Sequence, residues 1–124
     1  MKLSDLPTLG AALDAGIFAG LTTTAAGEHC AVVLLSDRSD KRLTWKKAKA
    51  WAEELGAALP TRPISALLFA NVKSHIEADW YWTADELDGS YAWGQGFGNG
   101  SQDGDLRKSY EGRAVAVRLI QLTA

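Results

Sequence analysis

The chain has one cysteine, no long apolar run and no extended block of like charge. Because Cys30 has no cysteine partner, an intramolecular disulfide is excluded, and the apolar run over residues 30–35 predicts a small buried thiol. No stretch approaches the roughly 20 apolar residues that a membrane-spanning helix requires, so we expect no membrane insertion. Residues 1–8 carry one lysine and an early aspartate, which is not typical of a secretory signal. We therefore expect a protein that is cytoplasmic when synthesised and virion-associated only if it leaves the cell within a larger assembly.

Basic residues are too few to form a strong positive field. The sequence holds 13 Lys and Arg residues against 15 Asp and Glu residues, for a net charge of −2. Nucleic-acid-binding domains usually carry a basic field that displaces counterions from phosphates, so we expect no nucleic-acid partner. Four basic residues gather near the C-terminal end and are interpreted as a solvated rim, with a polyanion site as the alternative: Arg107, Lys108, Arg113 and Arg118.

Catalytic and metal-binding spacings are also lacking. His29 and His75 are isolated from each other, and no serine lies in a nucleophile-elbow motif. We therefore expect no enzymatic activity and no cofactor. Residues 99–104 resemble the opening of a calcium-binding loop, but the twelfth position, where a bidentate acid is required, is Tyr110. A polar turn is the main interpretation of this segment, and calcium binding is the alternative.

The composition is that of one globular domain spanning residues 1–124, with 47% hydrophobic and 23% charged residues. Residues 16–21 and 30–35 predict two strands of a hairpin, separated by a polar turn. Residues 1–14 show no clear pattern, and residues 36–42 predict a loop.

Two helices are predicted in the middle of the chain. Thr44 can cap a helix over residues 45–55, and Gly56 can end it in a left-handed conformation. Thr61 can cap the second helix, whose apolar stripe comprises Ile64, Leu67, Leu68 and Val72.

The C-terminal half predicts strands over residues 80–82, 91–97 and 113–121, with loops over 83–90 and 98–112. Strands followed by two helices and then strands with long loops favour the α+β class.

Tryptophan and glycine are concentrated in this C-terminal half. Three of the five tryptophans lie between positions 80 and 93, and glycines at positions 94, 96, 98 and 100 would leave room for a ring to pack closely. On strands, Trp80 and Trp82 share one face, and Tyr91, Trp93 and Phe97 share one face. Although these rings could all be core, tryptophan is rarely fully buried. We therefore predict a ligand-binding surface formed by Trp80, Trp82, Tyr91, Trp93 and Phe97, with a polar rim of Gln95, Asn99, Gln102, Asp103, Asp105 and Arg107.

A series of short motifs carries a resemblance to a known family. They occupy residues 43–45, 48–52, 59–62, 66–71, 80–82, 91–93 and 113–118. In their order and spacing the chain resembles the Lcl C-terminal-domain-like family of small bacterial and prophage proteins, which is related to the C-terminal domain of collagen-like bacterial adhesins. The family is similar to the C-type-lectin-like fold shared with formylglycine-generating enzymes.

The resemblance implies a C-type-lectin-like fold, a twisted antiparallel sheet with two helices and long C-terminal loops that display the ligand surface. It also implies association with a phage tail or tail fibre, host recognition and a homo-oligomer, a trimer in the adhesin branch. The chain departs from the pattern at Ile64, where the family has the glutamate of a capping box. It also lacks the C-terminal cysteines of the formylglycine-generating branch and the Glu-Pro-Asn signature of calcium-dependent lectins.

The sequence therefore predicts a non-catalytic recognition module that binds a cell-surface glycan or protein, with a phage tail-fibre protein as a further partner. The alternative is a structural or assembly protein, such as a fibre-associated subunit or chaperone, that buries the same surface against a partner chain.

Overall fold

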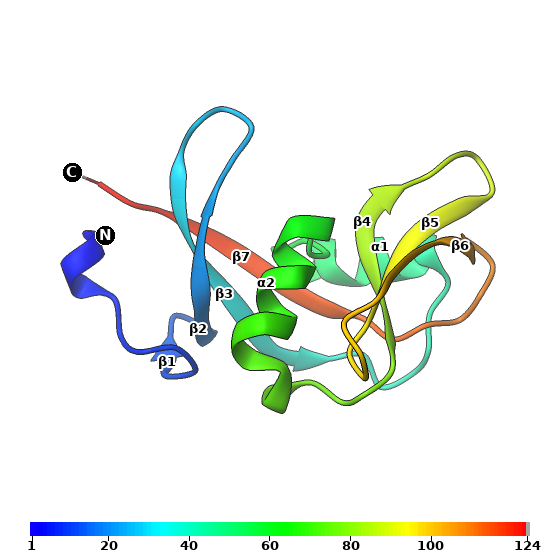
Figure 1. Ribbon diagram of the computed structural model, residues 1–124, viewed down its shortest axis with the longest axis horizontal. Coiled ribbons are helices and arrows are strands. Elements are labelled where there is room, and N and C mark those ends of the chain that lie inside the picture. Colours follow the sequence, from blue (N-terminus) through cyan, green and yellow to red (C-terminus); the bar gives the residue numbers. More distant parts are fainter. Residues whose placement is uncertain (124) are drawn as a thin grey trace.

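The computed structural model describes residues 1–123 and has the α+β architecture that the sequence predicts. Within these residues, two α-helices and seven strands form two antiparallel sheets, with strand orders β1-β2-β3-β7 and β4-β5-β6 (Figure 1). The strands are β1 (Ala12–Leu13), β2 (Gly16–Thr23), β3 (His29–Arg38), β4 (Trp80–Glu86), β5 (Tyr91–Gly96), β6 (Gln102–Arg107) and β7 (Val115–Gln121). The α-helices are α1 (Trp45–Glu54) and α2 (Arg62–Val72), and two 3-10 turns are η1 (Leu3–Asp5) and η2 (Lys73–His75).

Local capping sets the helix boundaries where the sequence predicts them. The hydroxyl of Thr44 accepts a hydrogen bond from the amide of Lys47 at 3.4 Å, and Gly56 follows α1 with φ of 67°. The hydroxyl of Thr61 accepts from the amide of Ile64 at 3.4 Å, which caps α2. None of the helices in the described part of the chain is long and apolar enough to cross a membrane.

Strand β3 is buried on both faces because the two helices cover opposite sides of its sheet. Val32 and Leu34 join the core cluster that includes α2, whereas Val33 and Leu35 join the cluster that includes α1. Figure 1 shows α2 in front of the long strands β3 and β7, with α1 behind them. Burying one such side chain contributes roughly 1.5–3 kcal/mol, so these apolar strands anchor the fold.

The sheet of β4, β5 and β6 carries the Trp- and Gly-rich part of the chain. Trp80, Tyr81 and Trp82 on β4 lie opposite Gly96, Gln95 and Gly94 on β5, respectively. A bridge between Tyr81 and Arg113 connects this sheet to the segment that leads into β7.

Met1 and Thr123 lie together at the side of the β1-β2-β3-β7 sheet that is far from the β4-β5-β6 sheet (Figure 1). The amide of Thr123 donates a hydrogen bond to the carbonyl of Met1 at 2.8 Å.

Strands β2, β3 and β4 are longer than predicted, and β6 was not predicted. Residues 98–112 were predicted as a loop, but β6 occupies Gln102–Arg107 within them. This segment has little apolar alternation, and its strand conformation depends on pairing with β5. Likewise, β3 continues to Arg38 and β4 to Glu86, into regions predicted as loops, because neighbouring strands supply their hydrogen-bond partners.

Candidate functional site

The tryptophans of β4 and β5 lie on opposite faces of one sheet. The register pairs Trp80 with Gly96 and Trp82 with Gly94, so both tryptophans share a face with the glycines of β5. Trp93 directly precedes Gly94 in the sequence, so it points to the other face. The five predicted aromatic residues therefore form two separate groups and not a single surface.

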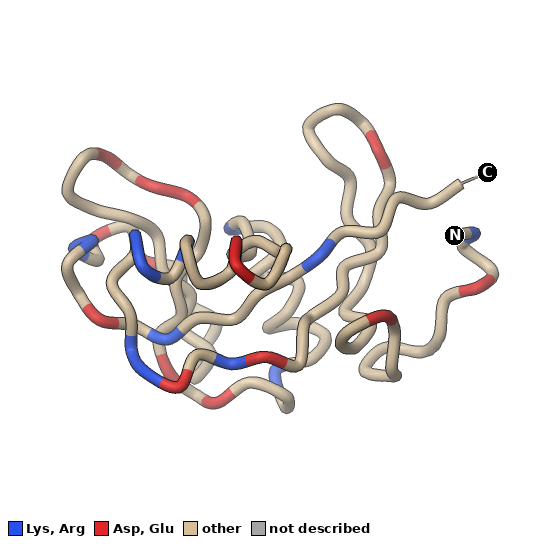
Figure 2. The backbone as a smooth tube through the Cα atoms, turned by 180° about the vertical axis from the view of Figure 1, so that it is seen from behind, with Lys and Arg blue, Asp and Glu red and all other residues tan. Residues whose placement is uncertain are grey.

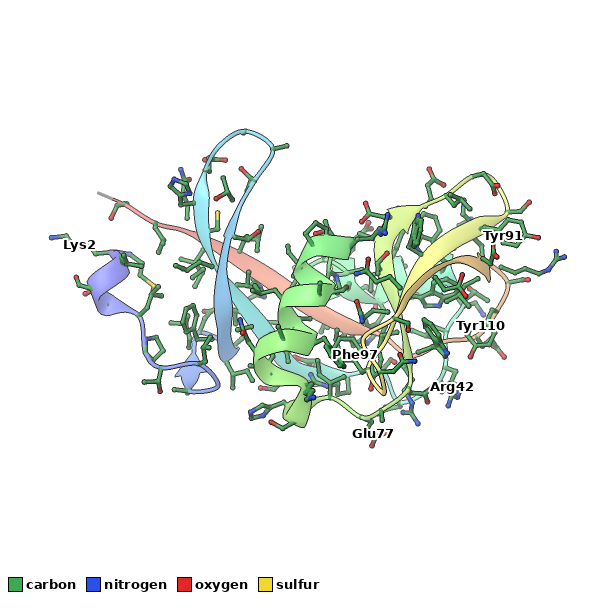
Figure 3. The ribbon with its side chains drawn as sticks, in the orientation of Figure 1. Lys2, Arg42, Glu77, Tyr91, Phe97 and Tyr110 are labelled. Carbon is green, nitrogen blue, oxygen red and sulfur yellow. The ribbon has the colours of Figure 1, made fainter. Side chains whose placement is uncertain are left out.

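Three of the predicted contact residues are inside the protein. Trp82, Gln95 and Phe97 are 1%, 1% and 4% exposed, respectively. The indole of Trp82 donates a hydrogen bond to the carbonyl of Leu43 at 2.8 Å and packs in the core cluster beneath α1. Phe97 packs against Tyr81 and lies between α2 and the β4-β5-β6 sheet (Figure 3). These side chains support the surface from below and are not available to a ligand.

Trp80 is half-buried and lies in a hollow of about 350 Å³, which we call the Trp80 groove. A Cβ atom on Gly96 would stand 3.5 Å from the Trp80 ring, an ordinary van der Waals distance. Of the alternating glycines, Gly94 and Gly100 serve close packing, because a Cβ atom there would clash with Leu106 and with the Phe69 ring, respectively, whereas Gly98 meets nothing closer than 3.8 Å. The groove is lined by Ala78, Asp79, Trp80, Gly96, Gly98 and Asn99.

Asp79 is a fixed negative charge at the edge of the Trp80 groove. Its Oδ2 accepts hydrogen bonds from Arg42 at 2.6 Å and Arg113 at 2.8 Å, and its Oδ1 accepts from the Trp80 amide at 2.7 Å. Burial is the largest single influence and by itself would raise the pKa of Asp79. The hydrogen bonds from the two arginines and the amide together outweigh it and hold the pKa at about 2.

Asn99 supplies donors on the other side of the groove. Its Oδ1 accepts from the amide of Ser101 at 3.0 Å, so its orientation is set by the turn. Asn99 is exposed, and its side-chain amide carries two N–H donors.

On the opposite face, Trp93 is half-buried in a shallower hollow of about 520 Å³, the Trp93 surface. The guanidinium of Arg62 lies 3.5 Å from the centre of the Trp93 ring. A Cβ atom on Gly104 would stand 2.9 Å from the nearest atom of the same ring. The ring is thus held between α2 and β6. The surface is lined by Arg62, Pro63, Ala66, Asp85, Glu86, Trp93 and Gln102.

A polar network fixes Arg62 on the Trp93 ring. The Nε of Arg62 donates to Gln102 at 3.1 Å, and Gln102 donates to the buried Gln95 at 2.9 Å. The backbone amide of Arg62 donates to Asp85 at 2.7 Å. Arg62 and Asp85 were absent from the predicted site because nothing in their local sequence indicates that α2 meets β5.

The remaining rim residues mainly stabilise their own turns or neighbours. Asp103 accepts a hydrogen bond from the amide of Asp105 at 2.8 Å, while Asp105 itself is exposed. Arg107 lies 5.5 Å from the ring centre of the half-buried Tyr91. Within residues 1–123, no three His, Cys, Asp or Glu side chains are placed to hold a metal ion.

The basic residues near the C-terminal end do not form a patch. Lys108 pairs with Glu86 at 2.6 Å, Arg118 with Asp14 at 3.4 Å, and Arg113 with Asp79. Figure 2 shows basic and acidic residues interleaved along the chain.

The Trp80 groove and the Trp93 surface offer the same combination, a half-buried indole beside hydrogen-bonding side chains. Trp80 and Trp93 provide apolar area, and Asp79, Asn99 and Arg62 provide polar groups. Such an arrangement can bind a ligand that has both an apolar face and polar edges. No protein-family model matches the chain, and no curated protein matches it.

Proposed function

We propose that the protein is a non-catalytic recognition module of C-type-lectin-like fold that binds a cell-surface glycan or protein through the Trp80 groove. The observation that carries the proposal is the position of Trp80, which is half-buried in a groove that Gly96 and Gly98 also line and is flanked by an ionised carboxylate. A flat indole with one polar edge stacks on the apolar face of a sugar ring or anchors a protein side chain.

The polar groups of the groove match the edges of a sugar. Asp79 remains ionised at neutral pH and can accept hydrogen bonds from hydroxyl groups, while Asn99 can donate to their oxygens. Because Arg42, Arg113 and the turn at Ser101 hold these side chains in place, little conformational entropy is lost on binding.

The Trp93 surface is a second contact region in this proposal. Arg62 covers one face of the indole, so a partner meets the guanidinium together with the ring edge and not a bare aromatic face. This favours a protein or polar ligand over stacking of a sugar. Tyr91 pairs with Arg107 across β5 and β6, and the nearby Asp105 is exposed, so these residues are further candidate contacts.

The wider biological role follows from the motif resemblance. Two antiparallel sheets with a helix on each face of the larger one are compatible with a C-type-lectin-like fold. Association with a phage tail or tail fibre, recognition of a host cell and trimer formation belong to the proposal on the same ground.

A binding screen tests the proposal. The purified protein, fluorescently labelled at an added N-terminal tag, is applied to a glycan array and to intact bacterial cells. We expect saturable binding to a defined glycan group or cell type. Absence of binding to both would contradict a recognition role.

An apolar hollow near the paired chain ends favours a second candidate, a structural or assembly subunit. Leu3 and Leu21 are 60% and 48% exposed there, which is unusual for leucines that share one hollow. The hollow, about 780 Å³, is lined by Leu3, Leu21, Thr22, Thr23, His29, Leu122 and Thr123.

Sedimentation separates this assembly role from recognition. If the chain is an assembly subunit, it should sediment as an oligomer or co-purify with a fibre protein, and Leu21→Ser should release the monomer. A monomer that binds cells or glycans favours recognition.

A further inference from the structure

Another hollow, smaller than the Trp80 groove, lies beside it. It occupies about 190 Å³ where the end of β3, the turn η2, the start of β4 and the segment before β7 meet. None of the aromatic residues of the predicted ligand surface lines it. Its lining comprises Arg38, Ser39, His75, Glu77, Tyr81, Arg113 and Ala114, with Glu77 at the outer edge of the molecule (Figure 3).

Tyr81 brings an unpartnered hydroxyl group to this hollow. The residue is only 4% exposed, and its ring packs edge-on against Phe97 with 5.1 Å between ring centres. No group within residues 1–123 accepts a hydrogen bond from the hydroxyl, and burial raises the pKa of Tyr81 while the charges of Arg113 and Arg38 act in the opposite direction. Because Ser65 Oγ is the only buried side-chain polar atom without a partner within residues 1–123, the Tyr81 hydroxyl is open to solvent from the hollow. An acceptor bound in the hollow would replace water as its hydrogen-bond partner.

Arg38 brings a positive charge that forms no salt bridge in the described part of the chain, and the neighbouring Asp37 acts on it only through space. Its Nη1 donates to the carbonyls of Leu35 at 2.5 Å and Asp37 at 2.9 Å, and its Nη2 donates to the carbonyl of His75 at 3.1 Å. These bonds hold the guanidinium in place but use three of its five N–H donors. Two donors and the full charge remain for another group.

The charge balance of the lining favours a single negative charge. Arg38 and Arg113 are the two cations of the hollow, and Glu77 is its one carboxylate, 3.4 Å from Arg113. Asp79 also contacts Arg113, but Arg42 compensates its charge from the other side. Glu77 is mostly exposed and pairs with Arg113, so no carboxylate of the lining pairs with Arg38; Asp37, outside the lining, acts on Arg38 only through space.

We propose that this hollow is a binding site for the carboxylate group of a small molecule, which accepts hydrogen bonds from the Tyr81 hydroxyl and from the free donors of Arg38. A planar carboxylate has two acceptor oxygens and one charge, which match a phenol and a guanidinium fork. The volume of the hollow restricts the ligand to a carboxylate with a short substituent. This site is separate from the Trp80 groove and does not depend on the proposed function.

Sodium acetate is the probe that tests this site. Backbone amides and arginine Nε–H groups are followed by NMR during titration at constant ionic strength, with sodium chloride and inorganic phosphate as reference salts. We expect saturable shifts at Arg38, Ser39 and Tyr81 with acetate and none with chloride. Tyr81→Phe should weaken acetate binding about tenfold, the effect of losing one hydrogen bond to a charged group. Arg38→Gln should abolish it.

Tyr110→Phe is the matched control, because this exposed tyrosine hydroxyl lies outside the hollow. It should bind acetate like the parent. Thermal unfolding without acetate checks folding, and Tyr81→Phe should be about as stable as the parent, since the hydroxyl makes no hydrogen bond to another group within residues 1–123. Equal responses to acetate and chloride, tighter binding of phosphate, or unchanged acetate binding in Tyr81→Phe would each overturn the proposal.

Discussion

The guanidinium of Arg62, the first residue of α2, lies 3.5 Å from the centre of the Trp93 indole on β5. This contact joins the helical and the Trp-rich halves of the chain and covers one face of a ring that the sequence places on the surface. The two half-buried tryptophans therefore differ in what they offer to a ligand, because no cation covers the Trp80 ring within residues 1–123.

Removal of the Arg62 side chain should expose the Trp93 ring. Arg62→Ala loses the stacked cation and the hydrogen bond to Gln102, and we expect a loss of stability of about 1–2 kcal/mol. Acrylamide quenching of tryptophan fluorescence should increase, and urea unfolding measures the stability. Arg107→Ala is the control, because Arg107 is exposed and lies 5.5 Å from the Tyr91 ring centre. Equal quenching in Arg62→Ala and the parent would show that the stacking is absent in solution.

Gly104 should not tolerate a side chain. A Cβ atom there would stand 2.9 Å from Trp93, so Gly104→Ala must displace the ring and should cost about 1–3 kcal/mol. Gly89→Ala provides the comparison, because a Cβ atom at Gly89 meets nothing within 4 Å, and its effect should stay within about 0.5 kcal/mol. Urea unfolding of the two variants measures the difference. Similar losses of stability would contradict the packing of Trp93 on β6.

Asp79 should stabilise the folded protein at neutral pH and lose this effect in acid. Its pKa is lowered from 3.8 to about 2 in the folded state, so its contribution is fully present above pH 3.8 and disappears as the pH falls toward 2. Near the surface the contribution is on the order of 1 kcal/mol. NMR titration of the carboxyl group should give a midpoint near 2.

The variant Asp79→Asn should be less stable than the parent at pH 7 and should lose the stability change between pH 4 and pH 2. The exposed Asp105 supplies the control, Asp105→Asn, which should keep that change. An ordinary titration midpoint for Asp79 would show that Arg42 and Arg113 do not hold it in solution.

Trp82 should act as a core residue although it shares a strand face with Trp80. Trp82→Ala should cost about 3–5 kcal/mol, because it empties a fully buried site and removes one of the two donors to the carbonyl of Leu43, the other being the amide of Gly112. Trp80→Ala should cost clearly less, since Trp80 is half-buried. Chemical unfolding of the two variants compares them, and equal losses would mean that Trp80 is also a core residue.

Patterns carried by neighbouring residues were predicted from the sequence. The hydroxyls of Thr44 and Thr61 cap helices a few residues away, and both helices begin where expected. Strand alternation also placed Trp80 and Trp82 on one face. Strand β6 was missed because its conformation depends on hydrogen bonds to β5 and not on its own polar sequence.

Contacts between distant segments could not be predicted in this way. Trp80 and Trp82 have the same residue type and the same face, yet α1 and Leu43 cover only Trp82. Similarly, the stacking of Arg62 on Trp93 and the pairing of Arg42 with Asp79 depend on how α2 and the segment before α1 meet the second sheet. The candidate surface is therefore smaller than the sequence predicts and includes residues from outside the C-terminal half.

The most direct test of the recognition role compares the binding of Trp80→Ala with that of the parent on the glycan or cell type found in the screen. Leu87→Ala is the control, because Leu87 is an exposed apolar residue outside the Trp80 groove. Loss of a central aromatic contact costs about 2 kcal/mol or more, so the dissociation constant of Trp80→Ala should rise at least roughly thirtyfold, while Leu87→Ala binds like the parent. Unchanged affinity of a folded Trp80→Ala protein would contradict the proposal that the Trp80 groove is the ligand-binding site.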